Sequence, residues 1–336
     1  MAKKIKMGNA IIGGNNKVFI IAEAGVNHEG SFEAAQEMVC VAAKAGADAV
    51  TFQHIIDTEL NVKQPGPKKF NWERWLLTNK EIKQLFALAK KKKLFCTACV
   101  IDTKNVDTIV DYGADFFKIV SGDITNIPFL RYCAKKGLPL FISTGAASLG
   151  EIEAAVNAVR SEGNDNVVLY HTNTHYPTPL QEVNLRVLTT LKAAFDEIIG
   201  FCDHTEGYLA PFIATVLGAN VIEKHFTLNR NKKGPDYQVS LEPGELKEMI
   251  QNIRNIEMIL GAPVKKLLAS EKTTYKFARR SIVAKQKISQ GTCITQNMLA
   301  FKTPGTGFSP SFKDYIIGRK AAKNIAQDEI IAEDMI

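Results

Sequence analysis

Eight short apolar runs rich in Val, Ile and Phe recur along this chain, and most of them are separated by segments with helical character. They occupy residues 18–26, 48–53, 94–100, 116–121, 139–144, 167–172, 198–204 and 221–226. Strands that alternate with helices pair in parallel through right-handed crossovers. Eight such units within about 210 residues favour a closed (β/α)8 barrel, the TIM barrel, over an open sheet.

Helix signals, and a change in the sequence pattern near residue 277, divide the chain further. The segments "SFEAAQEMVCVAAKAGA" and "SLGEIEAAVNAVRSEG" open with Ser31 and Ser148, which are expected to cap helices. A long helix is expected over 241–262, and the charged segment after it is expected to be a linker. From residue 277 short β runs alternate with turn residues, as in a small, mostly β domain that is not expected to stand entirely alone. The expected regions are a barrel (1–262), a linker (263–276) and this small domain (277–336).

Composition excludes several classes of partner. The chain has 336 residues, of which 46% are hydrophobic, as is ordinary for a folded soluble protein. Its net charge of +7 is spread out, and the longest basic run, 90–93, is typical of a solvated helix end rather than a nucleic-acid surface. No apolar stretch approaches the roughly 18 residues of a membrane span, and the start of the chain lacks a signal-peptide core. We expect a cytoplasmic protein that acts on small molecules.

The six cysteines point to neither a zinc site nor a disulfide framework. Cys96 and Cys99 form one C-x-x-C pair, and no second pair completes a zinc site. Residues three apart on a strand point to opposite faces of the sheet. We therefore predict reduced thiols, with Cys96 and Cys99 on opposite sides of one strand.

Polar side chains gather where the apolar runs end. A buried charge is costly unless it is paired or bound to a metal, and barrel enzymes place their chemistry at the carboxyl ends of the strands. One buried histidine is usually a hydrogen-bonded core group, and His171 and His175 could simply bond backbone. Polar groups at six or more strand ends predict an active site instead: Glu23, Asn27, His28, Gln53, His54, Lys118, Ser121, Asp123, Ser143, Thr144, Asp203, His204, Glu223 and His225.

These residues lie in segments that resemble a known family. "IAEAGVNHEGS", "KIVSGD", "STG", "YPTP", "DHTEG", "EKHFTLNR", "GPD" and "SLEP" are similar to the sialic acid synthases, which condense phosphoenolpyruvate with an amino-sugar. "ARRSIVA", "PGTGFSP" and "IGRKAAKNI" are similar to that family's C-terminal antifreeze-like (SAF) domain. The resemblance spans essentially the whole chain in the same order. It implies a barrel followed by an SAF domain, in a domain-swapped homodimer whose SAF domain covers the partner's barrel mouth.

The resemblance also implies roles for individual residues. His204 and His225 match the two ligands of a divalent cation, Mn²⁺ or Mg²⁺, which would polarise the sugar aldehyde. Glu23, Lys118 and Asp236 match the catalytic positions. The matched substrate-binding positions are Asn27, Thr51, Gln53, Cys99, Ser121, Asp123, Ser143, Thr174, Tyr176, Cys202 and Thr303. Asp203 and Glu223 either orient the metal ligands or are structural.

Several of these positions depart from the family pattern. Thr51 stands where a phosphate-binding lysine is expected, Cys99 where a threonine is expected, and Cys202 where a serine is expected. Thr174 replaces Asn or Ser, Asp123 is a shortened Glu, and Thr303 replaces an arginine that reaches the sugar. A charge-assisted contact is worth about 1.5–3 kcal/mol, so these changes weaken donor binding unless other groups compensate. The candidates for compensation are His54, Arg279, Arg280 and Lys302.

Three hypotheses follow. The first is an active nonulosonic acid synthase, whose acceptor sugar depends on loops such as 54–79 that hold no readable motif. The second is a divergent paralogue with a changed donor or little catalysis, which binds sugar and metal. The third is an aldolase or lyase in which Lys118 or Lys224 forms a Schiff base, although Lys224 has the opposite strand parity to His225.

Overall fold

The computed structural model describes residues 3–54 and 75–336. The chain divides into two compact units, Met1–Gly261 and Ala262–Ile336. In the first unit eight parallel strands close into a barrel in the order β10-β3-β4-β5-β6-β7-β8-β9. The predicted TIM barrel is therefore confirmed. Its strands are β3 (Phe19–Glu23), β4 (Ala49–Gln53), β5 (Phe95–Val100), β6 (Phe117–Ile119), β7 (Leu140–Ser143), β8 (Val167–His171), β9 (Ile198–Asp203) and β10 (Val221–His225).

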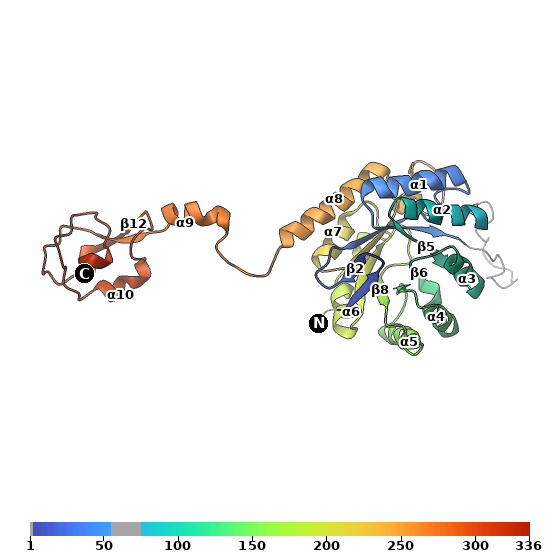
Figure 1. Ribbon diagram of the computed structural model, residues 1–336, viewed down its shortest axis with the longest axis horizontal. Helices are drawn as coiled ribbons and strands as arrows, with labels where there is room; N and C mark the ends of the chain where they lie inside the picture. Colours follow the sequence, from blue (N-terminus) through green and yellow to red (C-terminus); the bar gives the residue numbers. More distant parts are fainter. Residues whose placement is uncertain (1–2, 55–74) are drawn as a thin grey trace. The chain divides into compact units, whose positions relative to one another are not determined.

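Helices surround the barrel, as Figure 1 shows. The two predicted caps are confirmed: the Ser31 hydroxyl accepts the Ala34 N–H, and Ser148 forms a capping box with Glu151. The long helix predicted over 241–262 is also present. The helices of this unit are α1 (Phe32–Ala45), α2 (Asn79–Lys91), α3 (Thr103–Asp111), α4 (Ile127–Ala134), α5 (Leu149–Arg160), α6 (Val187–Ala194), α7 (Leu209–Val216) and α8 (Pro243–Leu260).

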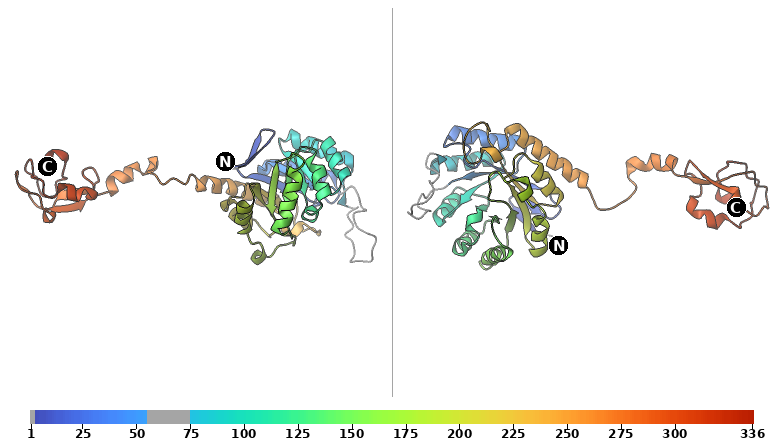
Figure 2. Two further views of the ribbon diagram at one scale, coloured as in Figure 1. Left: turned by 90° about the horizontal axis from the view of Figure 1, so that it is seen from below. Right: turned by 180° about the vertical axis from the view of Figure 1, so that it is seen from behind.

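An N-terminal hairpin, which the sequence reading did not predict, lies at one end of the barrel (Figure 2). Its strands are β1 (Lys4–Met7) and β2 (Ala10–Gly13). The buried side chains of Ile5, Met7 and Ile12 belong to the same core cluster as the residues inside the barrel. This cluster fills the amino-terminal end of the barrel, which leaves the carboxyl ends of the strands as the end where the predicted polar residues lie.

The second unit has a core of its own. It contains α9 (Lys272–Ala278), β11 (Ser281–Ala284), β12 (Leu299–Lys302) and α10 (Lys313–Ile316), and β11 and β12 pair antiparallel. Helix α9 lies largely in the segment that was expected to be a plain linker, and short β bridges hold much of the remaining chain together.

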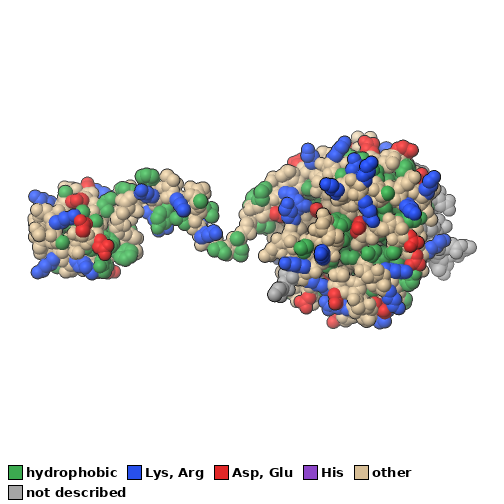
Figure 3. Space-filling view, viewed as in Figure 1, with side chains coloured by type: hydrophobic (Ala, Val, Ile, Leu, Met, Phe, Trp, Pro, Cys, Tyr) green, Lys and Arg blue, Asp and Glu red, His purple; other side chains and the backbone are tan. Residues whose placement is uncertain are grey.

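The surface carries charges of both signs. On the face of the first unit seen in Figure 3, Lys and Arg side chains are interspersed with acidic ones. Within the described residues, no helix has the length and apolar character that crossing a membrane requires. The loop predicted to select the acceptor falls largely on residues 55–74, which lie outside the described residues.

Candidate active site at the barrel mouth

The strand register brings the predicted polar residues to one end of the barrel. Glu23 pairs with Thr51 on one side and with His225 on the other, which closes the ring between the first and last strands. Cys99 pairs with Gln53 and Lys118, and Glu223 pairs with Cys202. Since side chains alternate along a strand, Glu23, Lys118, Cys202 and Glu223 all project into the barrel interior.

Lys118 is the central cation of this cluster. Its ammonium forms a buried ion pair with the Glu223 carboxylate and lies 3.6 Å from the Cys202 sulfur. Burial by itself would lower the pKa of Lys118, but the Cys202 and Glu223 side chains raise it above its ordinary value. Burial also raises the pKa of the Cys202 thiol, which therefore stays neutral, so the charge that holds Lys118 protonated comes from Glu223.

Glu23 is fixed by hydrogen bonds to both of its carboxylate oxygens. Oε1 accepts the Gly25 N–H at 2.6 Å, and Oε2 accepts the Thr51 hydroxyl at 2.6 Å. Burial and the nearby Glu223 carboxylate raise the pKa of Glu23 to about 7. Thr51 was predicted to contact substrate; in the structure its hydroxyl is bound to Glu23.

The raised pKa of Glu23 predicts a pH-dependent stability. Because the folded-state pKa lies above the ordinary 4.5, the contribution of Glu23 to stability is complete below pH 4.5 and is lost as the pH rises toward about 7. Glu23→Gln should therefore raise the unfolding free energy at pH 8 by about 1–3 kcal/mol, and by much less at pH 5. Urea unfolding at both pH values measures this difference. An equal effect at the two values would contradict it.

The two histidines predicted to bind metal lie side by side. The ring centroids of His204 and His225 are 5.5 Å apart, and the Tyr176 ring stacks on His204 at 3.9 Å. Burial lowers the pKa of His204 to about 4 and that of His225 well below its ordinary value. Both imidazoles are therefore neutral at physiological pH and can offer a nitrogen lone pair.

Neighbouring groups orient both rings. The Nδ1 of His204 lies 2.5 Å from the Asn173 carbonyl oxygen, to which it donates as the N–H tautomer, leaving Nε2 with the lone pair. The Nδ1 of His225 is buried without a hydrogen-bond partner, 3.8 Å from an Asp236 oxygen. Gly25 lies against His225 and Asp236. Its φ is +55°, and a Cβ there would stand 2.5 Å from that Asp236 oxygen. Only glycine fits this position.

The arrangement fits a divalent cation held partly by the protein. A cation about 2.1 Å from one nitrogen of each ring is compatible with the centroid separation of 5.5 Å. Over the described ranges, no three His, Cys, Asp or Glu side chains form a ready-made metal cluster.

The other predicted site residues vary in their surroundings. Asn27 donates to the Phe226 carbonyl at 2.9 Å and to the Ser240 hydroxyl at 2.8 Å, so its amide nitrogen ties two loops together. The Ser121 hydroxyl accepts the Gly145 N–H at 3.1 Å. Ser143 is buried at the end of β7, Gln53 and Asp123 are partly buried, and Thr174 is exposed. Thr303 is an exposed residue of the second unit.

Several charged or polar groups at the strand ends are structural. Lys224 donates to Asp203 at 2.7 Å and to the Thr205 carbonyl at 2.6 Å, in a fully buried pair. His171 bonds the Val183 carbonyl at 2.7 Å, as anticipated for a core histidine. Burial lowers the pKa of His54, so this residue does not supply the missing positive charge.

The cysteines lie as their spacing predicted. All six are free, and Cys96 packs in the core beneath the helices. Cys99 lies close enough to Glu23 and Lys118 for their charges to influence its pKa, which burial raises.

The sequence reading passed over one interior residue, Tyr170. Its side chain is fully buried, and its ring face lies 4.4 Å from the Lys118 ammonium nitrogen. Strand parity could have found it, because Tyr170 lies two residues after Val168 and therefore points to the same, interior face of the strand.

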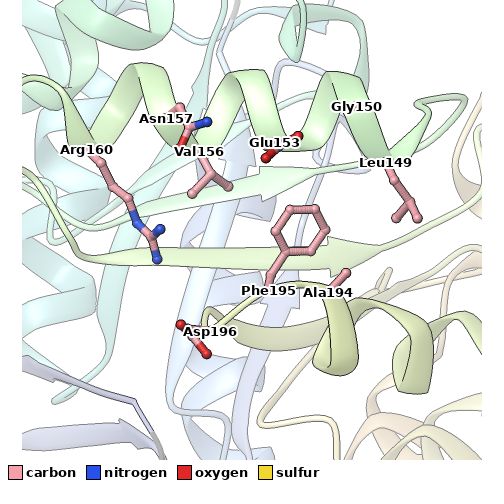
Figure 4. Close-up of a pocket in the computed structure, with 9 residues that line it drawn as sticks. All are labelled: Leu149, Gly150, Glu153, Val156, Asn157, Arg160, Ala194, Phe195 and Asp196. Carbon is pink, nitrogen blue, oxygen red and sulfur yellow. The ribbon is translucent and has the colours of Figure 1, made fainter.

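A separate groove of about 310 Å³ lies outside the barrel, between α5 and the segment after α6 (Figure 4). Leu149, Val156 and Phe195 line it together with Arg160. The Arg160 guanidinium is paired with the buried Glu197 at 2.6 Å, so its charge is already satisfied. None of the predicted site residues lines this groove.

Comparison with known proteins places these residues in context. The chain matches the NeuB family over residues 38–265 and the SAF domain over 279–336. It is 40% identical over 333 residues to the N,N'-diacetyllegionaminic acid synthase of Campylobacter jejuni, covering 94% of this chain and 99% of that one. It is 34% identical over 339 residues to human N-acetylneuraminate-9-phosphate synthase, covering 97% and 94%. The crystal structure of N-acetylneuraminic acid synthetase from Leptospira borgpetersenii superposes with a TM-score of 0.75 at 35% identity, over 82% and 95% of the two chains.

Proposed function

Because this chain belongs to the NeuB family, we propose that it condenses phosphoenolpyruvate with an N-acylated hexosamine to form a nonulosonic acid and phosphate. The observation that carries the proposal is the pair of neutral imidazoles, His204 and His225, 5.5 Å apart at the mouth that also holds the buried Lys118. In this reaction the enol carbon of the donor bonds to the aldehyde carbon of the open-chain sugar. Water adds at C2 of the donor, and phosphate leaves.

The positions of five residues at the barrel mouth support particular roles in this reaction. A divalent cation, Mn²⁺ or Mg²⁺, held by His204 and His225 would polarise the aldehyde oxygen. Lys118 binds the donor's anionic groups from inside the barrel. Glu23, pinned by Thr51 and Gly25, binds sugar hydroxyls. Asp236, whose pKa burial raises to about 6, holds or releases a proton beside His225.

The test is phosphate release from phosphoenolpyruvate across a panel of N-acylated hexosamines, including N-acetylmannosamine, its 6-phosphate and a diacetamido 6-deoxy hexose. Release should require both substrates and the cation, and a chelator should abolish it. The absence of release with every sugar in the presence of Mn²⁺ or Mg²⁺ would overturn the proposal.

One observation favours a second candidate, a paralogue with a changed donor. Among the described side chains of the mouth, Lys118 is paired with Glu223, and the Thr51 hydroxyl is committed to Glu23. A phosphate therefore meets fewer free cationic groups than the family pattern leads one to expect. The Schiff-base alternative has less support, since both lysines lie in buried ion pairs, and the raised pKa of Lys118 keeps its amine protonated and therefore not nucleophilic.

Thr51→Lys distinguishes the two candidates. If the mouth takes phosphoenolpyruvate, the added cation should lower the KM for it by about tenfold or more, the worth of one charge-assisted contact. Thr51→Met, which has a long side chain without charge, is the matched control and should not show this gain. Steady-state phosphate release measures both variants. A KM that stays the same or rises in Thr51→Lys would favour the changed donor.

We further propose that the protein is a homodimer. Helix α7 exposes Leu209, Ile213 and Val216, at 59%, 44% and 55% of their surfaces, along one stripe. Apolar side chains at this spacing line one face of a helix, and such a face suits contact with a second copy. Light scattering that gives the mass of one chain at micromolar concentration would contradict the dimer.

A further inference from the structure

An aromatic floor lies inside the barrel beneath Lys118. The Lys118 ammonium nitrogen is 4.4 Å from the centroid of the Tyr170 ring. The ring of Phe141 is 6.1 Å from that of Tyr170, and the ring of Phe116 is 4.4 Å from that of Phe141. All three residues are fully buried and belong to the core cluster of the barrel interior. Lys118 therefore stands between this floor and the open end of the barrel.

Gly200 makes room for the Tyr170 ring. The two residues are register partners on β8 and β9. A Cβ at Gly200 would lie 2.8 Å from Cδ1 and 2.9 Å from Cε1 of that ring, closer than such contacts allow. The backbone of Gly200 does not lie in the left-handed region, so glycine is not needed there for its conformation. What its lack of a side chain provides is space for the ring.

The hydroxyl group does not explain the presence of tyrosine at this position. The Tyr170 oxygen is buried and has no well-aligned hydrogen-bond partner, and its contact with the Glu223 carboxylate is a weak, poorly aligned hydrogen bond. Burial and the nearby Glu223 carboxylate raise the pKa of the phenol, which is therefore neutral. A buried polar atom without a partner is unfavourable. The favourable contribution of Tyr170 comes from its ring face, which attracts a cation through the ring quadrupole.

We propose that Tyr170, seated against Gly200, is a positioning residue that fixes the Lys118 ammonium in the barrel mouth and so sets the affinity for the donor's anionic groups. This inference rests on the proposed function, in which Lys118 binds phosphoenolpyruvate. An ammonium has three N–H donors. Glu223 takes one, the Cys202 sulfur 3.6 Å away takes a second, and the ring covers one side of the group, so the directions left for an incoming anion are restricted. Without the ring, only Glu223 and Cys202 hold the ammonium, and the flexible lysine stem is free to move it away from the position that faces the donor.

The experiment compares Tyr170→Phe with Tyr170→Leu. Phenylalanine keeps the ring face and removes only the hydroxyl, so the KM for phosphoenolpyruvate should stay within about twofold of the wild-type value. Leucine removes the ring, and this KM should rise by about threefold to thirtyfold, the range expected for a cation–ring contact. The KM for the sugar should not change in either variant. If both variants lose donor affinity equally, or if the sugar KM rises as much as the donor KM, the positioning role is wrong.

A measurement that needs no catalysis separates this inference from the proposed function. Protons above an aromatic face resonate upfield, so NMR of protein with isotope-labelled lysine should show an upfield-shifted Lys118 signal. Its loss in Lys118→Gln distinguishes it from the signals of Lys83 and Lys136, which also lie over tyrosine rings. The shift should persist in Tyr170→Phe and disappear in Tyr170→Leu. A wild-type protein without such a signal would overturn the inference even if it is an active synthase. A signal with this pattern would support the contact between Lys118 and the Tyr170 ring even if no sugar gives phosphate release.

Gly200→Ala gives an independent check by the same spectrum. The added methyl group should displace the Tyr170 ring and reduce the upfield shift while Tyr170 itself is intact. Thermal unfolding of each variant establishes that it is folded. A folded Gly200→Ala protein with an unchanged Lys118 signal would show that Gly200 does not hold the ring.

Discussion

Replacing either His204 or His225 by alanine should lower metal-dependent phosphate release by about a thousandfold or more and leave the barrel folded. The two rings lie together at the mouth, both neutral, and the buried Nδ1 of His225 has no other partner. A bound cation supplies several kcal/mol of charge stabilisation in the transition state, and each 1.36 kcal/mol is a factor of ten in rate. Losing one of only two protein ligands removes most of that contribution.

The matched control for this prediction is His175→Ala. His175 lies in the loop after β8, close in sequence to Thr172 and Asn173, which contact His204. Its own side chain is 64% exposed and lies 3.8 Å from Glu182. It should retain wild-type activity. Calorimetric titration with Mn²⁺ should show tight binding to the wild type and to His175→Ala, and weak binding to the other two variants. Full activity in His204→Ala or His225→Ala would remove that residue from the metal site.

Lys118→Met should both abolish turnover and destabilise the protein strongly. Lys118 and Glu223 are 5% and 2% exposed, so removing the cation leaves an uncompensated carboxylate inside the barrel. Breaking a buried ion pair in this way costs about 3–5 kcal/mol. The double variant Lys118→Met/Glu223→Gln should recover much of this stability, because no buried charge is left unpaired, but it should recover no activity.

Urea unfolding of the two single variants and the double variant forms a cycle that measures this coupling. Lys136→Met is the surface comparison. Lys136 pairs with Asp107 at 2.6 Å at the solvent-accessible surface, so the change should cost far less than the loss of Lys118. If the changes in unfolding free energy of the two single variants add up to that of the double variant, Lys118 and Glu223 are not energetically coupled. Turnover in the double variant would show that Lys118 is dispensable for binding the donor.

Local patterns were sufficient to predict the barrel and the polar residues that end its strands. Alternation of apolar runs with helical segments located the strands, and Ser31 and Ser148 marked helix starts through capping, which depends on residues only three positions apart. Strand parity placed Lys224 opposite to His225 and separated Cys96 from Cys99. The hairpin at β1 and β2 escaped this reading, because two strands of four residues carry little periodic signal.

By itself, the sequence determined which side chains reach the carboxyl ends of the strands, since that depends on a period of two along each strand. Only the tertiary structure decided their partners: Lys118 with Glu223, Lys224 with Asp203, Thr51 with Glu23, and Tyr170 beneath the ammonium. Each of these contacts joins residues on different strands. Such a contact depends on the register between strands and on closure of the barrel, neither of which any local run of residues encodes.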